Sequence, residues 1–251
     1  MAIIALNLYS LRTHCTTAEA LDETLGKLKK IGYPSVQLSG VPNVSPEDVK
    51  RLLDKHGIGC CACHDNLAQL RSDLPGIVKK MKTLGAGFTA LGAPPQDELV
   101  PEKFGNLIKD LDSFARSFAK EGLRFGYHNH AFEFMRRDGK TLLEMIYEGA
   151  PHLNGEPDTH WVQRGGGDSV AWIRKLAGRL PAVHLKDYVW RDGAACFAEV
   201  GQGNLNWTEI LKASVESGAE LFIVEQDEPT PGRDIFDSVA LSYNFLKARV
   251  R

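Results

Sequence analysis

The sequence lacks the features that mark membrane-bound, exported or disulfide-rich proteins. No stretch approaches the roughly 18 consecutive apolar residues that a membrane-spanning helix needs. The start, Met-Ala-Ile-Ile-Ala-Leu-Asn, has no basic region and only a short apolar run, unlike a secretory signal peptide. The 5 cysteines are an odd number, and three of them crowd at Cys60, Cys61 and Cys63, which does not suit a disulfide framework. We therefore expect a cytoplasmic protein with no membrane partner.

An excess of charge of one sign is also missing. The 30 Lys and Arg residues face 32 Asp and Glu residues, a formal net charge of −2, and no segment forms a basic block. Proteins that bind the nucleic-acid backbone concentrate positive charge on one surface, so we expect no nucleic-acid partner. Hydrophobic residues make up 43% of the chain, which is enough for a sizeable core and excludes intrinsic disorder. No linker or low-complexity stretch interrupts the sequence, so residues 1–251 are predicted to form a single domain.

What the sequence does contain is a repeated pattern of a glycine followed by an extended apolar run. Each such glycine ends an amphipathic helical stretch, where it can adopt the left-handed conformation that caps a helix. These glycines recur about 30 residues apart, at Gly32, Gly57, Gly85, Gly122, Gly155, Gly178 and Gly218. Together with the N-terminal run of residues 3–8, the seven runs make eight strands separated by helices, and this alternation indicates parallel pairing.

Eight strand–helix units in about 250 residues match an α/β fold of the (β/α)8 TIM-barrel type. An open, doubly wound sheet is the alternative architecture. That sheet carries a glycine-rich phosphate-binding turn after its first strand, but residues 7–12, Asn-Leu-Tyr-Ser-Leu-Arg, contain no glycine. The later segment Gly201-Gln202-Gly203 lacks the third glycine of such a turn. We therefore predict a TIM barrel.

Acidic and imidazole side chains stand where four consecutive strands in the second half of the chain are expected to end. These strand-end residues are His128, Asp158, His184 and Glu225. They are each about one strand–helix unit apart, and the carboxyl ends of barrel strands lie together at one face. Imidazole and carboxylate groups that converge there suit a divalent first-row metal ion. We therefore predict that these four residues form a metal site, although any one of them alone would be an ordinary polar side chain.

The three neighbouring cysteines and His64 make a second cluster of metal-ligand types. Successive residues of a strand point to opposite faces of the sheet. Cys60, Cys61, Cys63 and His64 therefore cannot all reach one ion. We expect the cysteines to fill the core, and we expect His64, at the end of its strand, to face a substrate.

Several segments of the second half resemble the sugar phosphate isomerase/epimerase family of the xylose isomerase-like TIM-barrel superfamily. They are Tyr-His-Asn-His-Ala-Phe-Glu-Phe (127–134), Asp-Thr-His-Trp-Val-Gln (158–163), Val-His-Leu-Lys-Asp (183–187), Glu-Val-Gly-Gln-Gly-Asn-Leu-Asn-Trp (199–207) and Ile-Val-Glu-Gln-Asp-Glu (223–228). The resemblance implies a single metal held by Glu, Asp, His and Glu. The last three ligands carry over to Asp158, His184 and Glu225, whereas His128 stands in place of the first glutamate. Glu133, in the following loop, is the alternative fourth ligand.

The resemblance implies a metal-dependent isomerase or epimerase that converts a sugar or keto-sugar through an enediolate. Glu225 would act as general base, and His128 or Glu133 would return the proton. Lys186 would neutralise the developing charge, or would instead pair with Asp187 or another loop acid. The metal would polarise the substrate carbonyl, and two imidazoles with two carboxylates favour Mn²⁺ or Zn²⁺ over Mg²⁺ or Co²⁺.

Other side chains that follow the strands are candidates for contact with a sugar or polyol. They are Tyr9, Arg12, His64, His130, Trp161 and Trp190, of which the two tryptophans could equally be packing residues. Because an imidazole replaces one family glutamate, a lyase or dehydratase that acts on a keto-inositol or 3-keto-glycoside is an alternative. A non-catalytic sugar-binding barrel is a third interpretation. Members of the family often pair, so a homo-oligomer is an alternative to a monomer.

Overall fold

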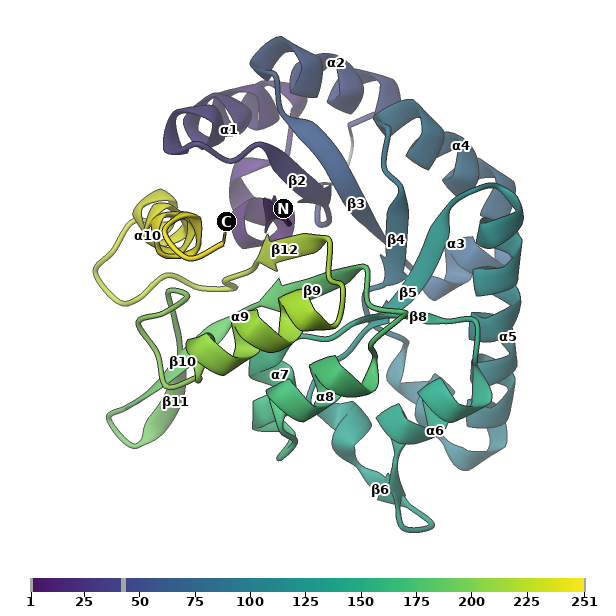
Figure 1. Ribbon diagram of the computed structural model, residues 1–251. Helices are drawn as coiled ribbons and strands as arrows, with labels where there is room; N and C mark the ends of the chain where they lie inside the picture. Colours follow the sequence, from purple (N-terminus) through teal and green to yellow (C-terminus); the bar gives the residue numbers. More distant parts are fainter. Residues whose placement is uncertain (1, 42–43, 251) are drawn as a thin grey trace.

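The computed structural model describes residues 2–41 and 44–250, and its central feature is a ring of parallel strands (Figure 1). The strands lie in the order β8-β5-β4-β3-β2-β1-β12-β9 around the ring. Their bounds are β1 (Ile3–Asn7), β2 (Ser35–Leu38), β3 (Gly59–Asp65), β4 (Phe88–Leu91), β5 (Arg124–His128), β8 (Asn154–Glu156), β9 (Ala182–Leu185) and β12 (Leu221–Val224). The order of the strands along the chain is therefore their order around the sheet, which confirms the predicted TIM barrel.

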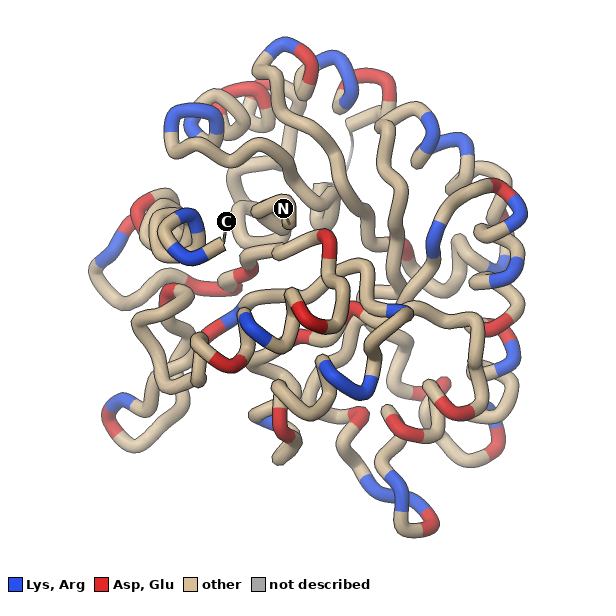
Figure 2. Tube along the Cα trace, viewed as in Figure 1, with Lys and Arg blue, Asp and Glu red and all other residues tan. Residues whose placement is uncertain are grey.

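Helices cover the outside of this ring. The main ones are α1 (Ala18–Ile31), α2 (Pro46–His56), α4 (Leu74–Leu84), α5 (Pro101–Lys120), α6 (Leu142–Gly149), α8 (Ser169–Lys175), α9 (Trp207–Glu216) and α10 (Ile235–Lys247). Shorter elements follow the strands: η1 (Leu8–His14), α3 (Leu67–Ser72), η2 (Gln96–Leu99), η3 (Phe132–Phe134), α7 (Thr159–Arg164) and the hairpins β6 (Arg136–Arg137) with β7 (Lys140–Thr141) and β10 (Asp187–Arg191) with β11 (Ala194–Ala198). None of the described helices is long and apolar enough to cross a membrane. Acidic and basic residues are interspersed along the outer helices (Figure 2).

Six of the seven glycines predicted to end helices do adopt positive φ angles. They are Gly32, Gly57, Gly85, Gly122, Gly178 and Gly218. The prediction is wrong for Gly155, because this glycine lies inside β8 and the preceding helix α6 already ends at Gly149. A Cβ at position 155 would lie 2.6 Å from Leu176 Cδ1. The glycine therefore allows close packing of the strand against Leu176 rather than a helix cap.

The barrel closes between β8 and β9, where the two strands meet through a bridge instead of a ladder. Asp158 pairs with His184 in this bridge, and the His184 N–H donates to Pro157 O at 3.0 Å. The Thr159 hydroxyl donates to Lys186 O at 2.8 Å and adds a second link. This closing seam therefore lies at the level of two of the predicted metal ligands.

The inside of the barrel is filled by mostly small apolar side chains and one large ring. They are Ala5, Ala62, Phe88, Ala90, Ala182, Leu221 and Ile223. Phe88 is fully buried, and it lies against the strand β5 at Gly126. A Cβ at position 126 would lie 2.7 Å from Phe88 Cζ and 3.0 Å from Asn154 O. The barrel is thus a packed core and not a pore.

Gly126→Ala is expected to destabilise the protein by about 1–3 kcal/mol, because the added methyl group must displace Phe88 or the neighbouring strand β8. Gly105→Ala, at an exposed position of α5 where an added Cβ meets nothing within 4 Å, is the matched control. It should stabilise the protein by about 0.5–1 kcal/mol, since alanine favours the helix. Urea unfolding followed by circular dichroism measures both effects. A Gly126 variant as stable as the wild type would contradict the packing described above.

Candidate metal centre and active site

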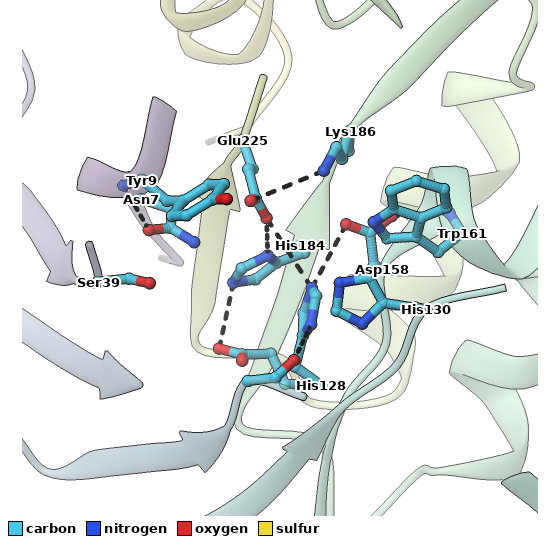
Figure 3. Close-up of polar contacts among 12 residues, drawn as sticks. Asn7, Tyr9, Ser39, His128, His130, Asp158, Trp161, His184, Lys186 and Glu225 are labelled. Atoms are coloured by element: carbon cyan, nitrogen blue, oxygen red, sulfur yellow. Dashed lines mark hydrogen bonds and ion pairs between the residues drawn. The ribbon is translucent and has the colours of Figure 1, made fainter. Parts of the chain in front are cut away.

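The four predicted metal ligands meet at the carboxyl end of the barrel (Figure 3). His128 ends β5, Asp158 follows β8, His184 lies in β9 and Glu225 follows β12. Their ligand atoms all lie within 4.8 Å of one another, and all four side chains are buried. His184 Nδ1 is 2.7 Å from Glu225 Oε2, and His128 Nε2 is 3.5 Å from Asp158 Oδ2. The strand-end positions therefore converge as the spacing in the sequence predicts.

Two atoms at the centre of this cluster have no hydrogen-bond partner. His128 Nδ1 donates to Gly92 O at 3.0 Å, so Nε2 is left with a lone pair that faces Asp158. Neither His128 Nε2 nor Asp158 Oδ2 is hydrogen-bonded, although both atoms are buried. A buried acceptor without a partner is costly, and a cation between these atoms would satisfy both. The donor set and its unpaired atoms therefore fit a divalent metal.

The carboxylates of the cluster are held in their charged form. Burial opposes the ionisation of Glu225, but the nearby Lys186 and His184 outweigh it and hold its pKa well below the usual value. Burial likewise opposes the ionisation of Asp158, but the nearby positive charge of Lys186 helps to lower its pKa. Burial also disfavours a charged His184, yet the carboxylates of Glu156 and Glu225 raise its pKa to about 10. In the metal-free protein the proton that His184 Nδ1 shares with Glu225 therefore occupies a position that a cation would take.

Lys186 pairs with a loop acid, though not with the adjacent Asp187. Its Nζ lies 2.7 Å from Asp227 Oδ2 and 3.6 Å from Glu225 Oε1. The ammonium group also lies 5.0 Å from the centre of the Trp161 ring. Lys186 is almost fully buried, and the surrounding carboxylates raise its pKa in spite of this burial. A permanent positive charge therefore stands beside the predicted general base.

Asp187 organises the following loop and forms no ion pair with the Lys186 side chain. Its carboxylate accepts hydrogen bonds from the backbone N–H groups of Gly201 and Gly203, both at 3.0 Å, and from Trp207 Nε1 at 2.5 Å. A Cβ at position 203 would lie 2.2 Å from Asp187 Oδ1. The segment Gly201-Gln202-Gly203 therefore wraps around a carboxylate of the protein itself, which explains its glycines without a phosphate.

A cavity of about 370 Å³ opens beside the ligand cluster. Its walls include His128 and Glu225 from the cluster together with three predicted substrate contacts, Tyr9, His64 and His130. His130 Nδ1 has no hydrogen-bond partner, although it is buried. The structure thus brings three of the six predicted contact residues to one cavity with the candidate general base.

The other three predicted contact residues do not line this cavity. Trp161 lies behind His130, with 5.4 Å between the ring centres. Arg12 donates from its guanidinium to Tyr9 O and Asp227 O and braces the loops around the cavity. Trp190 lies on the β10–β11 hairpin, and its side chain is 66% exposed. Its aromatic ring and its position just after the seventh predicted strand indicated a sugar contact, but the hairpin that carries it leaves the side chain in solvent.

The structure does not bring Glu133 to the four-residue cluster. Glu133 lies in η3, where it is fully buried and accepts hydrogen bonds from the Tyr127 hydroxyl and the His130 N–H, both at 2.8 Å. Its carboxyl group therefore fixes the turn that carries His130. Cys60 and Cys63 are part of the hydrophobic core, as predicted, whereas Cys61 is only partly buried and packs against the residues inside the barrel.

Sequence analysis overlooked two buried polar residues next to the cluster, Glu156 and Gln37. Glu156 precedes Asp158 by two positions, lies in β8 and is fully buried. Residues two apart in a strand share a face, and acidic residues are rare in strands, so the signal was present in Gly-Glu-Pro-Asp. Gln37 lies in the short strand β2, where a single polar residue gives no comparable signal.

Glu133→Gln is expected to change how stability depends on pH. Burial raises the pKa of Glu133 from 4.5 to about 7, so between these values the folded protein holds a proton that the unfolded chain has lost. Stability therefore falls as the pH rises through this window. The variant should gain about 2–3 kcal/mol over the wild type between pH 5 and pH 8, measured by urea unfolding.

Glu98→Gln provides a control for this comparison. Arg71 lowers the pKa of Glu98, so this carboxyl is ionised in both the folded and unfolded states above pH 5. Its stability difference from the wild type should therefore stay constant between pH 5 and pH 8. Parallel stability curves for Glu133→Gln and the wild type would show that Glu133 is ionised throughout.

The fold agrees with comparisons to known proteins. Among solved structures, the chain is similar to a sugar phosphate isomerase/epimerase from Parabacteroides distasonis, with a TM-score of 0.83, 21% identity and coverage of 100% of this chain and 99% of that one. An L-ribulose 3-epimerase gives a TM-score of 0.76 at 14% identity, with coverage of 99% and 94%. The probable 3-DHS dehydratase AsbF from Bacillus anthracis gives 0.74 at 13% identity, with coverage of 99% and 100%.

At these identities the structural likeness shows the fold alone. A comparison with curated proteins found no match. A family model described as Xylose isomerase-like TIM barrel, however, matches residues 25–247, which is most of the chain. The protein therefore belongs to the xylose isomerase-like TIM-barrel family.

Proposed function

We propose that this protein is a divalent-metal-dependent isomerase or epimerase that acts on a sugar or keto-sugar through an enediolate. The observation that carries the proposal is the four-residue cluster of His128, Asp158, His184 and Glu225 at the edge of a cavity, with two buried ligand atoms unpaired. When bound there, the metal would act as a Lewis acid on a substrate carbonyl and make the neighbouring C–H group more acidic. Two imidazoles with two carboxylates favour Mn²⁺ or Zn²⁺.

The residues around the cavity support removal of a proton from carbon. Glu225 lines the cavity, is held in its charged form and is therefore available as a base. Lys186, 3.6 Å from Glu225, supplies a fixed positive charge for the negative charge that develops on substrate oxygen. His130 faces the same cavity with an unpaired Nδ1 and is placed to hydrogen-bond a substrate hydroxyl.

A lyase or dehydratase that acts on a keto-inositol or 3-keto-glycoside is the second candidate. It is favoured by the presence of His128 where an epimerase of the family has a second glutamate, and by the position of Glu133 outside the cluster. Both observations leave Glu225 as the base of the cluster, and elimination needs one base at the reacting carbon. Proton NMR of the products in deuterated water separates the two reactions, because elimination forms a new double bond.

A non-catalytic sugar-binding barrel is the remaining alternative, and metal content tests it together with the metal site. His184→Ala is expected to abolish copurification of the metal and to leave the circular dichroism near that of the wild type, because one of four ligands is lost from a packed barrel. Cys61→Ser, outside the cluster, should retain the metal. Elemental analysis of the purified proteins measures both. Stoichiometric metal in His184→Ala would remove His184 from the ligand set.

Glu225→Gln tests the catalytic role. The amide keeps the shape and one oxygen ligand but is not a base, so exchange of the substrate C–H for deuterium should fall by about 10²–10⁴-fold. Binding of the substrate should weaken much less if the metal is retained. NMR in deuterated water measures exchange over a panel of ketoses, keto-inositols and 3-keto-glycosides. Equal exchange in the variant and the wild type would move the base to another residue.

A further inference from the structure

A chain of buried hydrogen bonds joins the predicted metal ligand His184 to the wall of the cavity. His184 Nε2 lies 2.7 Å from Gln37 Oε1, and Gln37 Nε2 donates to Glu156 Oε1 at 2.8 Å. The other oxygen of Glu156 lies 2.6 Å from Nε2 of His64, a residue that lines the cavity. Gln37, Glu156 and His184 are each 0% exposed. The chain therefore crosses the dry interior of the barrel end from β9 through β2 and β8 to β3.

The donors and acceptors of this chain fit a single arrangement of protons. A carboxylate only accepts hydrogen bonds, so Gln37 must present its NH₂ group to Glu156 and its carbonyl oxygen to His184. A carbonyl oxygen also only accepts, so His184 must carry a proton on Nε2. In a neutral imidazole the lone pair then lies on Nδ1, the nitrogen that faces Glu225 Oε2 at 2.7 Å. Figure 3 shows one ring nitrogen of His184 directed to Glu225 and the other directed away from it.

His64, Glu156 and His184 also lie close enough together to suggest a second metal site. Their atoms, however, are already paired with one another or with Gln37, at distances of 2.6 to 2.8 Å. The four-residue cluster differs, because two of its buried ligand atoms have no partner. His184 can turn only one lone pair to a metal, and Gln37 occupies the other nitrogen. The pairing favours a hydrogen-bonded support for a single metal site.

We propose that Gln37 and Glu156 are positioning residues that hold His184 with its Nδ1 lone pair directed to the metal ion. This inference rests on the metal site of the proposed function. Hydrogen-bond partners of a ligand histidine fix its tautomer and ring orientation, and their loss typically lowers metal affinity 10–100-fold. Here the neutral amide of Gln37 contacts the His184 ring, and the carboxylate of Glu156 behind it decides which end of the amide faces the ring.

Glu156→Gln tests this proposal with little change in volume. An amide at position 156 can donate to Gln37 Oε1, so the Gln37 side chain can turn its NH₂ group toward His184 and favour the proton on Nδ1 instead of Nε2. The affinity of the metal-free protein for Mn²⁺, measured by isothermal titration calorimetry, should fall 10–100-fold. Gln37→Leu removes the acceptor itself and should weaken Mn²⁺ binding to a similar extent, which covers the case in which Glu156→Gln fails to fold.

A double exchange separates positioning from a general effect on packing. In Gln37→Glu combined with Glu156→Gln, the carboxylate at position 37 accepts from His184 Nε2, and the amide at position 156 donates to that carboxylate while its oxygen accepts from His64. The contacts made to His184 and to His64 then keep their directions, and only the contact between positions 37 and 156 is reversed, so Mn²⁺ affinity should return to within a few-fold of the wild type. Glu98→Gln is the control, because Glu98 pairs with Arg71 and is not part of this chain of hydrogen bonds. This variant should bind Mn²⁺ as the wild type does.

The outcomes distinguish this inference from the function on which it rests. If the wild type binds no Mn²⁺ or Zn²⁺, the metal site fails and the inference fails with it. If the wild type binds one ion and Glu156→Gln binds it equally tightly, only the inference is overturned. Binding of two ions per chain, or a double exchange as weak as the single variant, would also overturn it. Rescue by the double exchange supports positioning, since a purely structural role of Glu156 would not be restored by moving its charge.

Discussion

The burial of charged groups at one end of the barrel is the constraint on which the rest of this structure depends. Glu156 and Asp158 are fully buried, and Glu225 is only 5% exposed. Carboxylates can remain ionised there only beside cations or hydrogen-bond donors, because desolvation would otherwise neutralise them. Lys186 and His184 supply that compensation for Glu225. The closely packed imidazoles and the buried ammonium group are therefore required by the carboxylates.

The fold could be predicted because its signals are repetitive. Glycines that end helices recur with the period of a strand–helix unit, and parallel strands bring their carboxyl ends to one face. The same geometry made His128, Asp158, His184 and Glu225 predictable, since each stands at the end of its own strand. Gly155 could not be assigned correctly, because a glycine that caps a helix and one that admits a neighbouring leucine look alike in sequence.

Parts of the site depend on contacts that the sequence does not encode locally. Glu156 and Gln37 come from strands far apart in the chain, and their meeting with His184 follows from closure of the ring. Trp190 resembles a residue just past a strand end, but residues 187–198 form a hairpin that carries it away from the cavity. Glu133 lies five residues after the predicted ligand His128, yet one turn of η3 directs its carboxyl group to Tyr127.

Two buried carboxylates outside the metal cluster organise the loops around the cavity. Asp187 gathers the backbone of the loop before α9. Glu199 accepts from the hydroxyl groups of Thr230 and Ser238 and pairs with Arg233, all of which belong to the segment after β12. That segment carries Asp227, the partner of Lys186. The electrostatic setting of Glu225 is therefore fixed in part by loop anchors that do not line the cavity.

The seam between β8 and β9 gives the candidate metal site a mechanical significance. A barrel with a weak joint between two strands opens first at that joint, because few hydrogen bonds must break. Asp158 stands on one side of the joint and His184 on the other, and the two form its bridge. An ion shared by these residues would tie the two edges together in the folded state only. Loss of such an ion would then favour local opening of the barrel, so amide hydrogen exchange along β8 and β9 would report on occupancy of the site.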